Sequence, residues 1–174
     1  MKNRALFDTY AQDILGHELF LEGKNVFSHG SVTIHDHSIA VAELSFSMIE
    51  NSRTIDKRCV VRAALLHDFF LYEWHVPGMR YILHGWAHPV IAARKAREIF
   101  HISPKEYACI KTHMWPWTLF HIPLSREGWI ISLADKIIAM KETLWCRGKR
   151  HTLQDSPAFV AESTKEKTVA PLGM

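Results

Sequence analysis

The stretch AALLHDFF, residues 63–70, sets an imidazole and a carboxylate side by side among apolar residues. Burying His67 or Asp68 without a partner costs free energy, because each side chain gives up its hydrogen bonds to water. The helical spacing of the surrounding apolar residues predicts that both lie on the buried side of a helix over residues 57–70. Their partners must therefore come from other parts of the chain.

The overall composition is typical of one globular domain. The chain has 174 residues, of which 48% are hydrophobic and 22% are charged, and its formal net charge is +3. A charge this small does not by itself indicate a nucleic acid polymer or an acidic membrane as a partner. No apolar run approaches the roughly 20 residues of a transmembrane helix, and the N-terminal stretch lacks the apolar core of a signal peptide. We therefore expect a cytoplasmic protein with no membrane partner, and its oligomeric state stays open.

The hydrophobic periodicity predicts an all-α fold. Apolar residues recur at spacings of three and four almost throughout, and no alternating apolar run is bounded by turn residues. The predicted helices cover residues 3–21, 33–50, 57–70, 87–101, 103–113 and 125–145. A long loop over residues 71–86 and an aromatic loop over residues 114–124 separate some of them. We expect a single helical domain over residues 1–146, followed by a short helix or loose tail over residues 147–174.

Helix starts are marked by residues that cap the free backbone N–H groups of the first turn. Either Ser31 or Thr33 can cap the second helix, and Asp56 can cap the third. Ser103 and Glu106 have the spacing of a capping box.

Histidine is the unusual component of this sequence. There are 12 histidines but only three cysteines, Cys59, Cys109 and Cys146, which are far apart and form no CxxC pair. This composition disfavours a disulfide framework or a thiolate zinc site, and predicts buried or neutral thiols. It favours a metal bound by imidazole and carboxylate ligands.

Further polar residues fall at apolar helical positions. His37 lies on the apolar stripe of its helix, and Asp135 lies inside the apolar run IISLADKIIAM. A carboxylate in such a run needs a cation, and Lys136 is not expected to supply it, because residues i and i+1 do not share a helix face. Two buried carboxylates and several histidines, with His88 or His113 among them, are satisfied most simply by a divalent metal.

These residues resemble the metal-binding series of the HD-domain superfamily of metal-dependent phosphohydrolases. That superfamily has the order H…HD…H…H…D on an all-helical scaffold. The matching segments here are HDHSIAVAEL, AALLHDF, HPVIAARKA, IKTHMW and SLADKI, which supply His37, His67, Asp68, His88, His113 and Asp135. The resemblance covers most of the chain, and the full series in order is far more specific than a lone HD dipeptide.

The resemblance implies a division of roles within a metal-binding core over about residues 31–146. A first metal would be held by His37, His67, Asp68 and Asp135. In two-metal members Asp68 would bridge to a second metal, held also by His88 and His113. The cofactor would be one or two divalent transition metals, chosen among Fe, Mn, Zn, Co and Ni. A metal-activated hydroxide would hydrolyse a small phosphorylated substrate, such as a nucleotide.

Residues near this series are candidates for contact with the substrate. Asp68 and Lys136 are the candidate catalytic residues, and Lys136 is a candidate for contacting a phosphate. His84 and Lys111 are candidates for binding a phosphate, and Trp115 is a candidate for stacking on a base. The alternative for each is an ordinary structural role, as a solvated charge, a loop histidine or an aromatic cover of the core.

The sequence departs from two subgroups of the superfamily. His113 is followed by Met114, so the tandem histidine of the members that cleave cyclic di-GMP is missing, as is their GYP signature. Residues 83–138 also resemble the symmetrical diadenosine-tetraphosphate hydrolases, but MWPW, residues 114–117, replaces their Thr-Gly. The sequence therefore assigns neither of these substrates.

Two other functions stay open. Some HD-fold proteins with the same six ligands are di-iron oxygenases, and the ligand series does not separate them from hydrolases. A non-catalytic HD module that senses a metal or a nucleotide would be expected to lack a ligand, whereas all six positions are filled here. A purely structural role would leave two buried aspartates unexplained.

Overall fold

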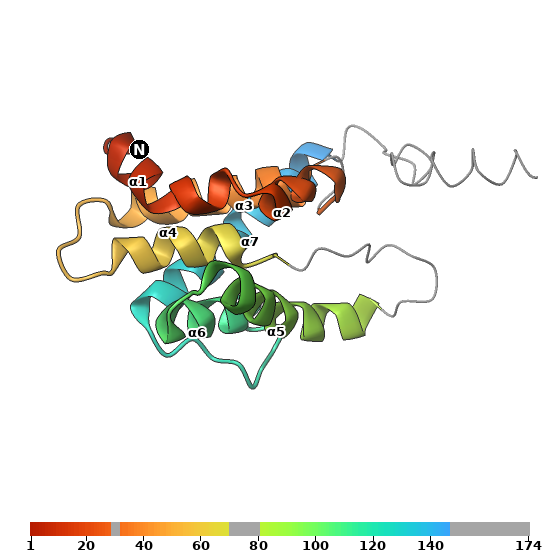
Figure 1. Ribbon diagram of the computed structural model, residues 1–174. Coiled ribbons are helices and arrows are strands. Elements are labelled where there is room, and N and C mark those ends of the chain that lie inside the picture. The colour runs from red at the N-terminus through yellow and green to blue at the C-terminus, as the bar shows by residue number, and fades with distance from the viewer. Residues whose placement is uncertain (29–31, 70–80, 147–174) are drawn as a thin grey trace, which may run out of the picture.

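The computed structural model describes residues 1–28, 32–69 and 81–146, with the backbone alone at residues 81–85 and 145–146. Across these ranges the chain forms seven α-helices, one short 3-10 helix and no strand beyond an isolated bridge between Phe27 and Thr33. The elements are α1 (Arg4–Leu15), α2 (Glu18–Leu21), η1 (Glu22–Asn25), α3 (Ile34–Ile49), α4 (Lys57–Leu66), α5 (Tyr81–Phe100), α6 (Pro104–Thr112) and α7 (Arg126–Cys146) (Figure 1). The predicted all-α fold is confirmed.

Helix α4 lies at the centre of the fold. It packs against α1, α3, α5, α6 and α7, and Figure 1 shows it between the α1–α3 side and the α5–α6 side. Every residue from Cys59 to Leu66 is buried, as expected for a helix that has neighbours all round. The end of α4 therefore delivers the next two residues, His67 and Asp68, to the middle of the domain.

The predicted caps hold the helix starts in place. The Thr33 hydroxyl accepts from the backbone N–H of Asp36, so Thr33 is the cap of α3. Asp56 caps α4 in the same way. Ser103 and Glu106 form the complete capping box at the start of α6. These local hydrogen bonds explain why the starts of three helices could be predicted from the sequence.

Some predicted boundaries were wrong. The helix expected over residues 3–21 is interrupted at Gly16, after which His17 caps the short α2. Helix α4 ends four residues earlier than expected, at Leu66 rather than residue 70. The last six residues of the predicted 71–86 loop belong to α5, which begins at Tyr81, and residues 71–80 lie outside the described residues.

The early start of α5 leaves Pro89 inside a helix, where a proline costs about 3 kcal/mol or more. The helix continues past it because the following apolar face is buried at Ala92, Ala93 and Ala96. Packing of that face outweighs the local penalty, which no local sequence pattern could reveal. Among the described residues, no helix combines the length and the apolar character needed to cross a bilayer.

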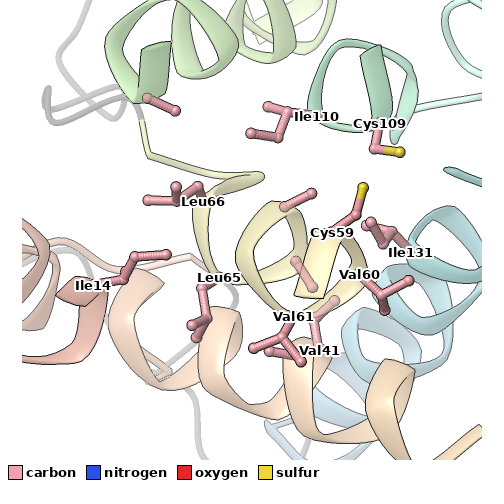
Figure 2. Packing of buried hydrophobic residues seen from close by; sticks show 14 of the residues in the cluster. Ile14, Val41, Cys59, Val60, Val61, Leu65, Leu66, Cys109, Ile110 and Ile131 are labelled. Atoms are coloured by element: carbon pink, nitrogen blue, oxygen red, sulfur yellow. The ribbon is translucent and has the colours of Figure 1, made fainter. Parts of the chain in front are cut away.

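The core forms where α4 meets its neighbours (Figure 2). Val41 of α3, Ile110 of α6 and Ile131 of α7 are fully buried around α4. Cys59 and Cys109 are buried, free thiols at the α4–α6 contact, as predicted for cysteines of this kind.

A buried guanidinium connects α4 to three other helices. Arg62 is 3% exposed, and its Nε donates to Glu106 Oε1 at 3.0 Å. Its Nη1 donates to Asp13 Oδ1 at 2.6 Å, and its Nη2 donates to the Phe100 carbonyl at 3.2 Å. Glu106 is itself only 2% exposed, so the two buried charges depend on each other. No local sequence pattern pointed to this network.

We predict that Arg62→Met lowers the free energy of unfolding by about 3–5 kcal/mol, because it leaves the Glu106 carboxylate buried without its cation. Chemical denaturation monitored by circular dichroism measures the change. The control is Arg58→Met on the exposed side of the same helix, which should stay within about 0.5 kcal/mol of the parent. Equal stability of the two variants would contradict the role given to Arg62.

Candidate metal centre

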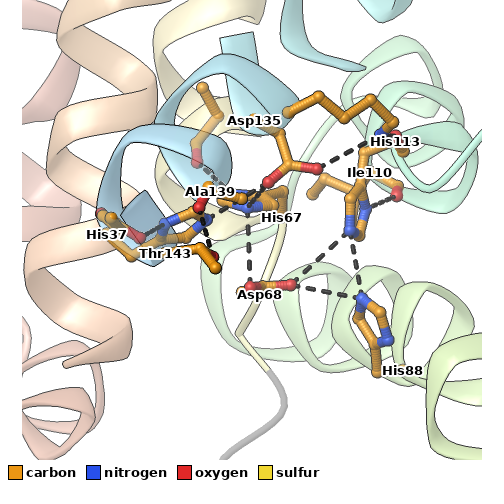
Figure 3. Close-up of polar contacts among 12 residues, drawn as sticks. His37, His67, Asp68, His88, Ile110, His113, Asp135, Ala139 and Thr143 are labelled. Carbon is orange, nitrogen blue, oxygen red and sulfur yellow. Dashed lines mark hydrogen bonds and ion pairs between the residues drawn. The ribbon is translucent and has the colours of Figure 1, made fainter. Parts of the chain in front are cut away.

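The structure brings all six residues of the predicted series into one cluster (Figure 3). They come from α3, the end of α4, α5, the end of α6 and α7. Three overlapping groups have ligand atoms within 4.8 Å of one another: His37–His67–Asp68, His67–His113–Asp135 and Asp68–His88–His113. The four histidines and Asp135 are buried, and Asp68 keeps 13% of its side chain exposed.

Helix ends orient two of the histidines. His67 and His113 are the C-terminal caps of α4 and α6, where the last carbonyls lack a partner within the helix. The Nδ1–H of His67 donates to the Ala64 carbonyl at 2.7 Å, and that of His113 donates to the Ile110 carbonyl at 2.8 Å. Each bond fixes the tautomer and turns Nε2 toward the cluster, an arrangement typical of metal-binding histidines.

A carboxylate that the sequence analysis missed orients the third histidine. The Nδ1–H of His37 donates to Glu142 Oε2 at 2.8 Å, while its Nε2 lies 3.3 Å from Asp135 Oδ1. Glu142 follows Asp135 by seven residues, which is about two helical turns and places both on one face of α7. That seven-residue spacing was the sequence signal by which Glu142 could have been identified.

Asp68 lies between two sets of imidazoles. Its Oδ2 is 3.6 Å from His67 Nε2, and its Oδ1 is 3.3 Å from His88 Nε2 and 3.6 Å from His113 Nε2. His67 Nε2 and Asp68 Oδ1 are buried and have no hydrogen-bond partner within the part of the chain that the structure describes. Buried polar atoms of this kind are costly unless a cation satisfies them, so the donor set fits one or more divalent metals.

The two carboxylates of the cluster remain ionised. Burial opposes their charge, but His67 and His88 outweigh it and hold the pKa of Asp68 well below its ordinary value. Burial is likewise outweighed at Asp135, where the hydrogen bond from His37 and the nearby charge of His67 hold the pKa well below its ordinary value. Both side chains are therefore in the protonation state that binds a metal.

The pKa values of His113 and His37 are shifted in opposite directions. Burial, together with the charges of His67 and His88, lowers the pKa of His113 to about 3, so this ring is neutral. Burial would also lower the pKa of His37, but its hydrogen bonds to Asp135 and Glu142 raise that pKa from 6.5 to about 10. His37 thus holds a proton that a metal cation would displace.

Lys136 forms an ion pair with Asp135, so the expectation that it would not supply a cation to this carboxylate was wrong. Its Nζ donates to the His113 carbonyl at 2.8 Å and lies 3.3 Å from Asp135 Oδ2. The rule about neighbouring residues concerns the direction in which side chains leave the helix. The long flexible stem of a lysine can bend back over that distance.

The other predicted substrate-binding residues are Trp115, Lys111 and His84. The Trp115 ring packs edge-on against Trp129, with centroids 4.7 Å apart, and both line a cavity of about 270 Å³ beside Lys136. Lys111 is half-buried on α6. Burial lowers the pKa of His121, and the charge of Lys111 lowers it further. His84 belongs to α5, but its side chain lies outside the described residues.

Comparison with known families agrees with this geometry. The family model of the HD domain matches residues 34–140, which is more than half of the 174 residues. The chain belongs to the HD domain family. No curated protein and no solved structure gives a match. The matched HD domain contains all six clustered residues, and its family consists generally of metal-dependent phosphohydrolases.

We predict that Glu142→Gln lowers the pKa of His37 in the metal-free HD domain below its value of about 10, because one of its two anionic partners becomes neutral. The raised pKa means that the charged ring stabilises the fold fully below about pH 6.5, and that this contribution is lost as the pH rises toward 10. The substitution should move that loss to lower pH.

An NMR titration of the imidazole resonances measures this pKa directly. The control is Glu98→Gln, an exposed carboxylate on α5, which should leave the His37 titration unchanged. An unaltered His37 pKa in Glu142→Gln would show that the His37–Glu142 hydrogen bond does not form in solution.

Proposed function

We propose that the protein is a metal-dependent phosphohydrolase that acts on a small phosphate ester, such as a nucleotide. The observation that carries this proposal is the position of Asp68. One carboxylate oxygen faces His67, and the other faces His88 and His113. A carboxylate placed in this way can join two metal sites, an arrangement found in many enzymes that transfer phosphoryl groups.

The proposed ligands follow from the three groups of side chains. The first metal would be held by His37, His67, Asp68 and Asp135, and the second by Asp68, His88 and His113. Imidazole nitrogen and carboxylate oxygen suit Fe, Mn, Zn, Co and Ni. When bound, such metals supply an activated water at neutral pH and neutralise the charge on phosphate oxygens.

The residues around the ligands fix their geometry. Glu142 holds the His37 ring, and the carbonyls of Ala64 and Ile110 hold His67 and His113. Lys136 links Asp135 to the backbone of His113, which joins α7 to the end of α6. We assign Lys136 a positioning role on this basis. A direct contact with the substrate stays a prediction for His84 and Lys111.

We predict that Asp68→Asn abolishes both metal retention and phosphate-ester hydrolysis, because the carboxylate shared by the two proposed sites is lost. Elemental analysis of protein purified without chelator, and a phosphatase and phosphodiesterase screen with several divalent metals, are made on the same preparation. The matched control is Asp36→Asn, an exposed carboxylate next to His37, which should keep both properties. A folded, metal-free Asp68→Asn protein with parental turnover would refute the proposal.

Oxygen dependence separates hydrolysis from the oxygenase alternative. Hydrolysis consumes only water, so the parent should turn over its substrate equally in aerobic and anaerobic solution. Turnover that stops without oxygen would contradict the hydrolase proposal and favour di-iron chemistry.

We predict that Lys136→Ala lowers turnover by roughly 10–100-fold, the usual effect of removing a partner that orients a ligand. The loss should be smaller than that of Asp68→Asn, because all six proposed ligands remain. Steady-state kinetics and metal content are the measurements. A positioning role predicts that kcat falls while KM changes little, whereas a rise in KM alone would indicate a contact with the substrate instead.

A further inference from the structure

The outer face of α7 carries an apolar stripe. Trp129, Leu133, Met140 and Leu144 are between 43% and 59% exposed. At 3.6 residues per turn they fall within about 60° of the helix circumference and extend along about 22 Å of its axis. The opposite face of α7 is buried against α3, α4 and α6. We call these four residues the α7 stripe.

This exposure is concentrated in one part of the chain. Of the twelve strongly exposed large hydrophobic side chains among the described residues, nine lie between Trp117 and Leu144. Single exposed apolar residues are normal on a protein surface, but a contiguous apolar patch usually marks an interaction site. The α7 stripe therefore calls for a partner surface.

The spacing of the α7 stripe is the same in both directions. From Trp129 to Leu144 the intervals are four, seven and four residues. In an antiparallel pair of identical helices related by a two-fold axis, this spacing sets each residue of the α7 stripe against another residue of the stripe, and each contact occurs twice. An antiparallel pair of α7 helices, with the axis between residues 136 and 137, would set Leu133 against Met140 and Trp129 against Leu144.

The geometry points to a homodimer in which the α7 stripes of two copies pack antiparallel. The cavity of about 270 Å³ lies at one end of the stripe, between Trp129, Leu133 and Lys136, with Trp115 beside them. In the antiparallel arrangement Met140 and Leu144 of the second copy lie over this end and fill the cavity. Trp115 then belongs to the interface and does not stack on a substrate.

Lys136 does not bring a buried charge into the middle of this interface. Its Nζ is turned inward to the His113 carbonyl and to Asp135. Lys136 lines the cavity, and the aliphatic stem of a lysine commonly adds apolar surface to such a wall. The dimer thus uses the outer side of the helix whose inner side supplies Asp135 and Glu142.

Light scattering coupled to size-exclusion chromatography tests the proposal on the full chain. The parent should have twice the monomer mass of 20.1 kDa. Leu133→Glu should reduce the mass to that of the monomer, because it buries a charge against Met140 of the second copy. The control is Met48→Glu, an exposed apolar residue on α3, which should leave the dimer intact.

Oxidative cross-linking tests the antiparallel register. In a Cys146→Ala background, Leu133→Cys with Met140→Cys should give a covalent dimer when diamide oxidises the two thiols to a disulfide and is itself reduced to the hydrazine. Within one copy the two positions are about 10 Å apart along the helix, too far for a disulfide. Each single substitution should not cross-link, because identical positions lie seven residues out of register.

Several outcomes would overturn the proposal. These are a parent that is monomeric at every concentration, a dimer that survives Leu133→Glu, and a double-cysteine variant that stays monomeric after oxidation. The first is also expected if residues 147–174 or another protein cover the α7 stripe. Metal content is measured on the same samples. Absence of bound metal from the parent protein would count against the proposed metal sites and not against the dimer.

Discussion

The arrangement of the helices around the site is constrained by the free-energy cost of burying the Asp68 carboxylate at the end of α4. Helix α4 is surrounded by other helices, so the chain that leaves it must place His67 and Asp68 in the interior. Desolvation alone would drive Asp68 toward its neutral form, and the surrounding imidazoles reverse that tendency. Every helix that supplies one of these imidazoles is thereby tied to the same point.

A second charge network at α4 serves a different purpose. Arg62, six residues before Asp68, is satisfied wholly by protein groups: Glu106, Asp13 and a backbone carbonyl. Its guanidinium donates along several directions and needs no further ligand. The Asp68 cluster keeps buried atoms without hydrogen bonds. The Arg62 network is therefore a structural ion pair, whereas the Asp68 cluster has donor atoms that suit a metal.

Helix α7 contributes to both the proposed metal site and the proposed dimer interface, each through a different face. Its inner face supplies Asp135 and Glu142 to the cluster of the HD domain, and its outer face carries the α7 stripe. Lys136 lies at the boundary, with its charge directed inward and its stem on the outer cavity. Packing of a second copy on the outer face would restrain this lysine, and with it the position of Asp135.

Local sequence patterns predicted the six residues that cluster and most of the helix starts. A capping side chain bonds the backbone two or three residues away, and an apolar stripe repeats every turn. The orientation of His37 by Glu142, the reach of Lys136 to Asp135 and the start of α5 ahead of Pro89 became clear only from the folded chain. The spacing of Asp135 and Glu142 places both on one face of α7. Spacing along one helix does not encode which other helix that face meets or how far a long side chain can bend.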